Sequence, residues 1–131
     1  METKMNVNEF LQKYRRVYTC MNLNVTRPRI RCADGYTVSV QAGWGIYSAP
    51  REDADCYTHV EVGYPSEHHG EFNEWSDGAG VFGFVPVDVV DKVLNDHGGI
   101  VGADFSNDGA GLWKDMYDEE NGGGETVQTI Y

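Results

Sequence analysis

The stretch Arg29–Ala42, RIRCADGYTVSVQA, decides the fold of this chain. Polar and apolar residues alternate on both sides of the dipeptide Asp34-Gly35, which is typical of a tight turn between two antiparallel strands. Every second residue after the turn is apolar, so one face of the second strand is expected to be buried: Tyr36, Val38, Val40 and Ala42. The stretch therefore predicts a β-hairpin that packs on a core.

Two further stretches have the composition of strands. Residues 57–64, YTHVEVGY, alternate again, and residues 81–85, VFGFV, are almost wholly apolar. The Gly- and Pro-containing segment 43–56 separates the first of them from the hairpin and is expected to be a loop. Ile100-Val101 is expected to form a short final strand.

Two helices complete the pattern. Asn6 and Glu9 form a capping-box pair. Apolar residues follow at helical spacing: Val7, Phe10, Leu11, Tyr14, Val17 and Tyr18. We expect this helix to end before Asn22. The second helix is predicted to begin at Pro86 and to end at Gly98-Gly99. Its apolar stripe is Val87, Val90, Val93, Leu94 and His97.

The order helix, hairpin, strand, strand, helix predicts an α+β fold. We expect an antiparallel sheet of about four strands with two helices packed on one face. This compact domain is predicted to span residues 1–101 of the 131 in the chain. Residues 102–131 are rich in Gly, Asp and Glu and are expected to be a loop-rich acidic extension, either part of the same domain or a flexible tail.

The charge of the chain is divided unevenly along the sequence. Residues 1–51 contain 8 Lys and Arg against 3 Asp and Glu, whereas residues 52–131 contain 2 Lys and Arg against 18 Asp and Glu. The formal net charge is −11. Such a surface repels nucleic acid and attracts basic partners, so we expect a basic protein partner and no direct contact with nucleic acid.

The sequence also bears on the compartment. It contains no apolar run of membrane-spanning length and no leader-like segment, and its odd count of 3 cysteines is awkward for a secreted disulfide framework. We therefore expect a cytoplasmic protein with no membrane partner.

Cys56 and His59 form a C-x-x-H pair, a spacing that can hold one tetrahedral metal ion. Cys32, at the end of the neighbouring hairpin strand, is a candidate third zinc ligand. The candidates for a fourth ligand are Cys20, His68 and His69. In a regular strand Cys56 and His59 point to opposite faces, so the site requires a bulge or a loop at Cys56. The alternative interpretation is that two or three of the cysteines are buried free thiols that act as small hydrophobic residues, beside an exposed His59.

Residues 104–109, DFSNDG, resemble the calcium-binding loop of EF-hand proteins. Oxygen-bearing side chains occupy its first, third, fifth and twelfth positions: Asp104, Ser106, Asp108 and Asp115. The segment departs from the pattern because Asp115 is shorter than the usual Glu and no helix is predicted before the loop. An ordinary Asp- and Gly-rich surface loop is the alternative, and we favour it.

The sequence has no catalytic motif. It lacks a nucleophile elbow, a phosphate-binding loop and a zinc-protease helix, so we do not expect an enzyme. His97 stands near the end of the predicted second helix, where a histidine interacts favourably with the helix dipole. We therefore expect a capping role for His97.

The stretches 29–42, 57–67, 82–90 and 97–100 resemble a family of small uncharacterised proteins that occur in phages and mobile elements of Firmicutes. The resemblance covers roughly residues 5–101 and brings no assigned catalytic residue. Small acidic phage proteins of this kind are similar to anti-CRISPR and other anti-defence inhibitors, several of which mimic nucleic acid or bind a CRISPR effector nuclease. The resemblance therefore implies an inhibitor that acts inside a bacterial host cell.

The acidity and the resemblance together favour an inhibitory binding protein that occupies the basic nucleic-acid groove of a CRISPR effector nuclease. The carboxylates expected to bind this surface are Glu67, Glu71, Glu74, Asp77, Asp118, Glu119 and Glu120. The alternative is a metal-binding module without catalytic activity. Its metal would be Zn²⁺ or Ca²⁺ at the two candidate sites described above.

Overall fold

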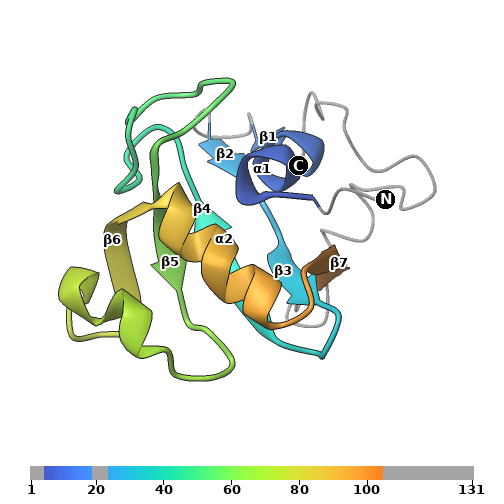
Figure 1. Ribbon diagram of the computed structural model, residues 1–131. Coiled ribbons are helices and arrows are strands. Elements are labelled where there is room, and N and C mark those ends of the chain that lie inside the picture. Colours follow the sequence, from blue (N-terminus) through green and yellow to red (C-terminus); the bar gives the residue numbers. More distant parts are fainter. Residues whose placement is uncertain (1–4, 19–23, 105–131) are drawn as a thin grey trace.

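A five-stranded antiparallel sheet forms the centre of the computed structural model, which describes residues 5–18 and 24–104 (Figure 1). In chain order the elements are α1 (Val7–Lys13), β1 (Arg16–Tyr18), β2 (Asn24–Thr26), β3 (Arg29–Cys32), β4 (Thr37–Gln41), β5 (His59–Gly63), the 3-10 helix η1 (Gly70–Trp75), β6 (Val81–Pro86), α2 (Val87–Asp96) and β7 (Ile100–Asp104). The strands of the main sheet are ordered β6-β5-β4-β3-β7, while β1 and β2 form a separate two-stranded sheet. The predicted α+β class is confirmed, with five strands in the main sheet where about four were expected.

The predicted hairpin is present as β3 and β4. Ile30 lies opposite Val38 in the antiparallel register. Gly35 closes the turn with a φ of 97°, a left-handed conformation that glycine adopts without steric cost. β7 pairs with the other side of β3, where Arg29 lies opposite Asp104. The final strand is therefore longer than predicted, and the sheet includes residues up to Asp104.

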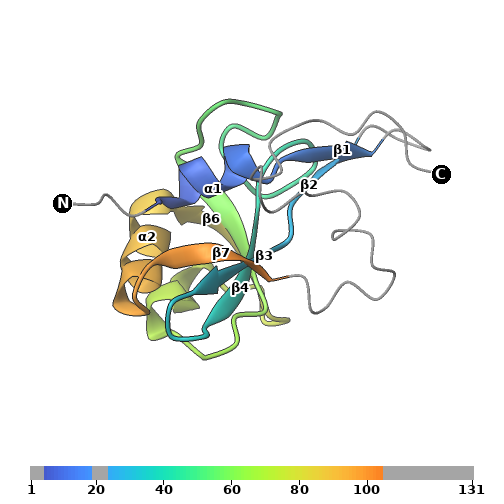
Figure 2. The ribbon, with the colours of Figure 1, turned by 90° about the vertical axis from the view of Figure 1, so that its right-hand side faces the viewer.

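α2 connects two strands that lie at opposite edges of the sheet. It follows β6 directly, crosses the face of the sheet and leads into β7 beyond β3 (Figure 1). Figure 2 shows α2 to one side of β3, β4 and β7. α1 packs beside α2, and the Val7 N–H donates to Asp91 Oδ1 at 2.8 Å. Within the described ranges, neither helix combines the length and the apolar composition that a membrane crossing requires.

One hydrophobic core fills the space between the two helices and the sheet. Alternate residues of the strands point into it and meet the apolar sides of both helices. Its members include Val7, Phe10, Leu11, Ile30, Val38, Val40, Val60, Val62, Val85, Val90, Val93 and Leu94. The other face of the sheet is polar, with half-buried Ser39, Gln41 and Glu61. The predicted packing of two helices on one face is confirmed.

The first helix is shorter than predicted. α1 ends at Lys13, and Arg16–Tyr18 forms β1 instead, with Val17 opposite Val25 of β2. The prediction of helix beyond Tyr14 is therefore wrong, although Tyr14 itself is buried in the core as expected. β-branched and aromatic residues suit strands, and pairing with β2 supplies backbone hydrogen bonds that override the helical spacing.

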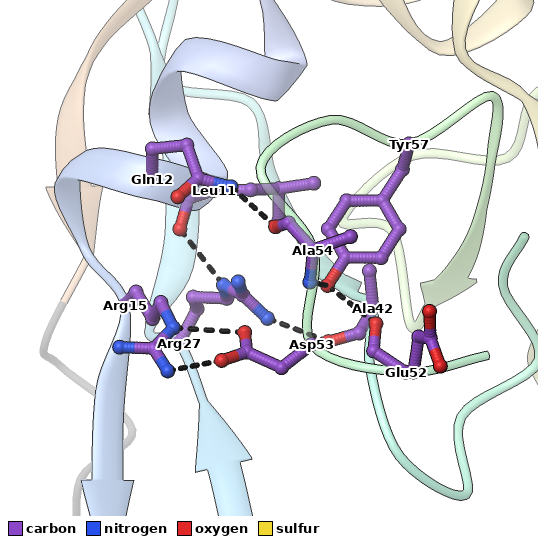
Figure 3. A network of polar contacts seen from close by, with 9 residues as sticks. All are labelled: Leu11, Gln12, Arg15, Arg27, Ala42, Glu52, Asp53, Ala54 and Tyr57. Atoms are coloured by element: carbon purple, nitrogen blue, oxygen red, sulfur yellow. Dashed lines mark hydrogen bonds and ion pairs between the residues drawn. The ribbon is translucent and has the colours of Figure 1, made fainter. Parts of the chain in front are cut away.

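Polar contacts anchor the loop between β4 and β5 to α1 (Figure 3). The Gln12 side chain donates to the Ala54 carbonyl at 2.9 Å. Arg15 forms an ion pair with Asp53, in which Nε donates to Oδ1 at 2.9 Å. These contacts hold the predicted loop of residues 43–56 against the helix.

Arg27 ties α1 to the end of β4 from within the protein. Its side chain is buried, and its guanidinium donates to the Leu11 carbonyl at 2.9 Å and to the Ala42 carbonyl at 2.6 Å (Figure 3). A charged donor in this position satisfies two carbonyls that the core would otherwise leave without partners. Arg27 is therefore part of the fold and is not available to a nucleic-acid surface.

Candidate functional site

A buried aromatic contact and hydrogen bonds hold residues 64–80, the acidic segment between β5 and β6, on the body of the protein. Phe72 of η1 is 1% exposed and packs on Phe82 of β6, with ring centroids 5.5 Å apart. The Ser66 N–H donates to the Thr37 carbonyl at 2.8 Å, and the Thr37 N–H donates to Ser66 Oγ at 2.9 Å. The segment therefore contains a helical turn and is fixed to β4 and β6.

Exposed carboxylates lie on this segment and beside it. We call them the acidic face: Asp34, Glu67, Glu71, Glu74, Asp77 and Asp96. Lys92 of α2 lies between two of them, 3.6 Å from Glu71 and 2.9 Å from Asp96. The hydrogen bond between Lys92 and Asp96 raises the pKa of the lysine and lowers the pKa of the carboxyl. Both groups are therefore charged at neutral pH, and the acidic face keeps a large excess of negative charge.

The acidic face includes four of the predicted partner-binding residues and two that the sequence analysis missed. Glu67, Glu71, Glu74 and Asp77 are exposed on the segment itself. Asp34 comes from the β3–β4 turn and Asp96 from the end of α2. These two become neighbours of the segment through the packing of α2 against η1 and against the β3–β4 turn. The composition of residues 65–80 does not indicate that Asp34 and Asp96 lie beside this segment.

Two histidines from distant parts of the chain meet within the acidic face. His69 is the N-cap residue of η1, and His97 is the C-cap residue of α2. Their Nε2 atoms lie 2.7 Å apart, and their ring planes are almost perpendicular, at 87°. His97 is 8% exposed, whereas His69 is half-buried. The predicted position of His97 at the helix end is correct, but its ring also makes a long-range contact that helix capping does not require.

Each of the two histidines also has a carboxylate at its other ring nitrogen. Asp34 Oδ2 lies 2.6 Å from His97 Nδ1, and Glu71 Oε1 lies 3.4 Å from His69 Nδ1. The Tyr36 N–H donates to Asp34 Oδ1 at 3.0 Å. This backbone hydrogen bond, together with the contact to His97, lowers the pKa of Asp34. Asp34 is therefore ionised at neutral pH and can orient His97 as a hydrogen-bond acceptor.

Glu67 lies beside the histidine pair. One carboxylate oxygen of Glu67 and one ring nitrogen from each histidine all lie within 4.8 Å of one another. We call Glu67, His69 and His97 the histidine cluster. Within the described ranges, it is the only group of three or more such side chains whose spacing suits a shared metal ion. Tyr36 stacks on His97, with centroids 4.0 Å apart and planes 5° from parallel.

The structure does not bring the predicted zinc ligands Cys32, Cys56 and His59 together. Cys32 ends β3, where its N–H donates to the Tyr36 carbonyl. His59 begins β5 at the other end of the sheet, opposite Pro86. The five residues of β4 lie between the positions of Cys32 and His59 along the sheet, and they span about 16 Å. Cys32 also points into the core, whereas His59 lies on the opposite, polar face of the sheet.

Cys32 matches the alternative interpretation of a buried free thiol. Its Sγ lies 3.8 Å from the Leu94 carbonyl, and burial raises its pKa to about 11. Such a thiol stays protonated at neutral pH and is a poor metal ligand. Cys56 is also a free thiol, but it is exposed.

The other predicted sites are described only in part. Asp104 is the last residue of β7. The remaining candidate calcium ligands Ser106, Asp108 and Asp115 lie outside the described residues. The same holds for the candidate partner-binding residues Asp118, Glu119 and Glu120.

Comparison of the chain with models of protein families, with curated proteins and with solved structures finds no match. Function is therefore inferred from the acidic face and the histidine cluster themselves.

Proposed function

We propose that this protein is a phage-derived inhibitory binding protein that uses the acidic face to occupy the basic nucleic-acid groove of a CRISPR effector nuclease. The observation that carries the proposal is the anchoring of the face: its carboxylates are exposed, while Phe72 of the same acidic segment is buried. Charges held on a folded element lose less conformational freedom on binding than charges on a flexible tail. Such an array complements a groove lined with Lys and Arg.

Three of the described arginines support this proposal because the contacts given for them serve the fold elsewhere. Arg15 pairs with Asp53, and Arg27 is buried against backbone carbonyls. Arg29 donates to the Tyr64 carbonyl at 2.7 Å. None of these contacts involves a carboxylate of the acidic face. Lys92 offsets one of its six negative charges, and the rest remain available to a partner.

The proposed activity is binding and not catalysis, in the cytoplasm of a bacterial host cell. A protein that fills the groove prevents the nuclease from binding its guide or target, so no bond needs to be broken. Long-range attraction between opposite charges would also speed the encounter of the two proteins. Inhibition of this kind weakens as salt rises because ions screen the exposed charges.

The test is a DNA-cleavage assay with purified CRISPR effector nucleases at several salt concentrations. The wild-type protein should inhibit cleavage, and the inhibition should decline with salt. Glu74→Lys should raise the half-inhibitory concentration about tenfold, because it places a positive charge on the acidic face. Asp77 needs a milder change, since its Oδ1 accepts from the Ala79 N–H at 2.7 Å. Asp77→Asn keeps that acceptor and removes the charge.

Glu52→Lys is the matched control. Glu52 is exposed on the loop between β4 and β5, away from the acidic segment, and its substitution changes the net charge by the same amount. We expect Glu52→Lys to inhibit as well as the wild type. Equal losses in the Glu52→Lys and Glu74→Lys variants would show that net charge, and not the acidic face, is responsible. Failure of the wild type to inhibit a panel of effector nucleases would reject the proposal.

A further inference from the structure

We infer that Glu67, His69 and His97 bind a divalent transition-metal ion, with Zn²⁺ as the best match. Of these residues only His69 was a candidate ligand in the sequence analysis, as a fourth ligand beside Cys32, Cys56 and His59. The site does not depend on the proposed inhibition, because a metal ion can bind here whether or not a partner binds the acidic face. The inference is carried by the positions of the ring nitrogens and of the carboxylates around them.

The first argument concerns the protons of the two imidazoles. A neutral imidazole carries one N–H, and a carboxylate at Nδ1 favours the tautomer with that proton on Nδ1. Asp34 lies at His97 Nδ1 and Glu71 at His69 Nδ1. Both Nε2 atoms then present lone pairs to each other at 2.7 Å. Two lone pairs repel at this distance, so with these tautomers a cation between the rings is needed to hold the pair together.

That cation is either a shared proton or a metal ion, and Glu67 favours the metal. A shared proton needs only the two nitrogens that it bridges, whereas a metal ion needs further ligands. One carboxylate oxygen of Glu67 lies within 4.8 Å of a ring nitrogen of each histidine. Two imidazoles and one carboxylate form a donor set that zinc uses in proteins, with water in the fourth position.

The distances require only a small opening of the pair. Two nitrogens at about 2.0–2.1 Å from one tetrahedral zinc ion are about 3.3 Å apart. The Nε2 atoms lie 2.7 Å apart in the structure, so an ion between them would separate the rings by about 0.6 Å. His69 is half-buried at the start of η1, and Glu67 is exposed. These two side chains can therefore adjust while His97 stays in place.

The surroundings of the cluster match those of metal-binding histidines. Such histidines usually donate their second ring N–H to a carboxylate, which fixes the tautomer and strengthens the ligand. Asp34 plays this part for His97 at 2.6 Å, and Tyr36 stacks on the same ring. The backbone is also fixed here, because the Asp34 N–H donates to the His97 carbonyl at 3.2 Å. A bound ion would clamp the acidic segment to the end of α2.

The test is zinc calorimetry on the full-length protein after removal of metal with a chelator. The protein should carry Cys20→Ser and Cys56→Ser, so that thiols other than the buried Cys32 cannot bind the ion. We expect one zinc ion per chain with a dissociation constant in the micromolar range or tighter. His69→Asn or His97→Asn should weaken binding by at least about 100-fold, and Asp34→Asn by about tenfold.

His68→Asn is the matched control, because His68 precedes His69 in the chain and is exposed. It should bind zinc as tightly as its parent. A readout that does not depend on variant stability is the ¹⁵N spectrum of the histidine rings. On zinc addition, the Nε2 signals of His69 and His97 should shift while those of His59 and His68 stay unchanged. Unshifted Nε2 signals, or equal affinity in His69→Asn and its parent, would overturn the assignment and leave a shared proton as the explanation.

Discussion

The ring of Tyr36 lies flat on the ring of His97, with centroids 4.0 Å apart and planes 5° from parallel. The same tyrosine is 2% exposed. Its hydroxyl has no hydrogen-bond partner among the described residues, and burial is the main cause that raises its pKa. The ring therefore supports the histidine, while the hydroxyl adds only the cost of burying a polar group.

Replacement of Tyr36 should separate these two effects. Tyr36→Phe keeps the ring and removes the unpaired hydroxyl, so we expect the free energy of unfolding to stay within about 1 kcal/mol of the wild type or to rise. Tyr36→Ala removes the ring and should lower it by about 3–5 kcal/mol. Urea denaturation of both variants measures the effect.

Tyr57→Phe is the matched control for the hydroxyl. The Tyr57 hydroxyl accepts from the Ala54 N–H at 2.9 Å and donates to the Glu52 carbonyl at 2.9 Å (Figure 3). Its removal should lower the free energy of unfolding by about 1–2 kcal/mol, since two partly buried hydrogen bonds are lost. A larger loss in Tyr36→Phe than in Tyr57→Phe would show that the Tyr36 hydroxyl is paired after all.

A second prediction concerns Gly98, which follows α2 directly after His97. It has a φ of 90°, and a Cβ at this position would lie 2.8 Å from the Cβ of Ala33. Gly98→Ala should therefore cost about 1–2 kcal/mol for the left-handed backbone and about 1–3 kcal/mol more for the overlap. Gly45→Ala is the control, because Gly45 has a φ of 72° and no atom near its missing Cβ.

The overlap can be tested separately from the backbone strain. In the double variant Ala33→Gly/Gly98→Ala, the contact between the two Cβ atoms is absent while the strain remains. We expect the extra cost of Gly98→Ala over Gly45→Ala to disappear in thermal denaturation of the double variant, measured against Ala33→Gly alone. If the extra cost persists, the loss has a cause other than the contact with Ala33.

A third prediction concerns the reactivity of the thiols. The pKa of Cys32 is raised to about 11 by burial, so only about 0.1% of it is thiolate at pH 8. Cys56 is exposed. In a Cys20→Ser background, a thiol-specific reagent should label one cysteine rapidly in the native protein and the second only after denaturation. Rapid labelling of both thiols in native Cys20→Ser protein would contradict the buried position of Cys32.

The sequence predicted the sheet well because each strand and turn has a local signal. The alternation around Asp34-Gly35 fixes the hairpin, and the stripe of α2 fixes its buried side. The histidine cluster has no such signal. Asp34 and His97 are 63 residues apart in the chain, and His69 and His97 are 28 apart. Only the crossing of α2 from one edge of the sheet to the other brings their segments together.

The zinc site predicted at Cys32, Cys56 and His59 is not formed, for a related reason. Cys56 and His59 are close in the sequence, which made them the natural candidates, but the pleat of a strand and the length of the sheet decide which donors can meet. Cys32 points into the core at one end of the sheet. His59 lies on the polar face at the other end of the sheet. The helix prediction beyond Tyr14 failed because pairing of β1 with β2 is a tertiary choice that helical spacing does not reveal.

The last prediction concerns the pH dependence of stability through the pair Arg15–Asp53. The hydrogen bond from Arg15 lowers the pKa of the Asp53 carboxyl below its usual value. A carboxyl whose pKa is lower in the folded than in the unfolded chain stabilises the fold above the unfolded value of about 3.9, and this contribution is lost as pH falls through the folded value. Asp53→Asn should therefore lower the free energy of unfolding at pH 7 but not at about pH 2–3.

The size of this effect is limited because both side chains are partly exposed. We expect at most about 1 kcal/mol at neutral pH, and less in high salt. Urea denaturation of wild type, Asp53→Asn, Arg15→Gln and the double variant between about pH 2 and pH 7 measures the coupling energy of the pair. The coupling should fall toward zero as the carboxyl is protonated. A coupling energy that is the same at both ends of this range would mean that the ion pair is not its source.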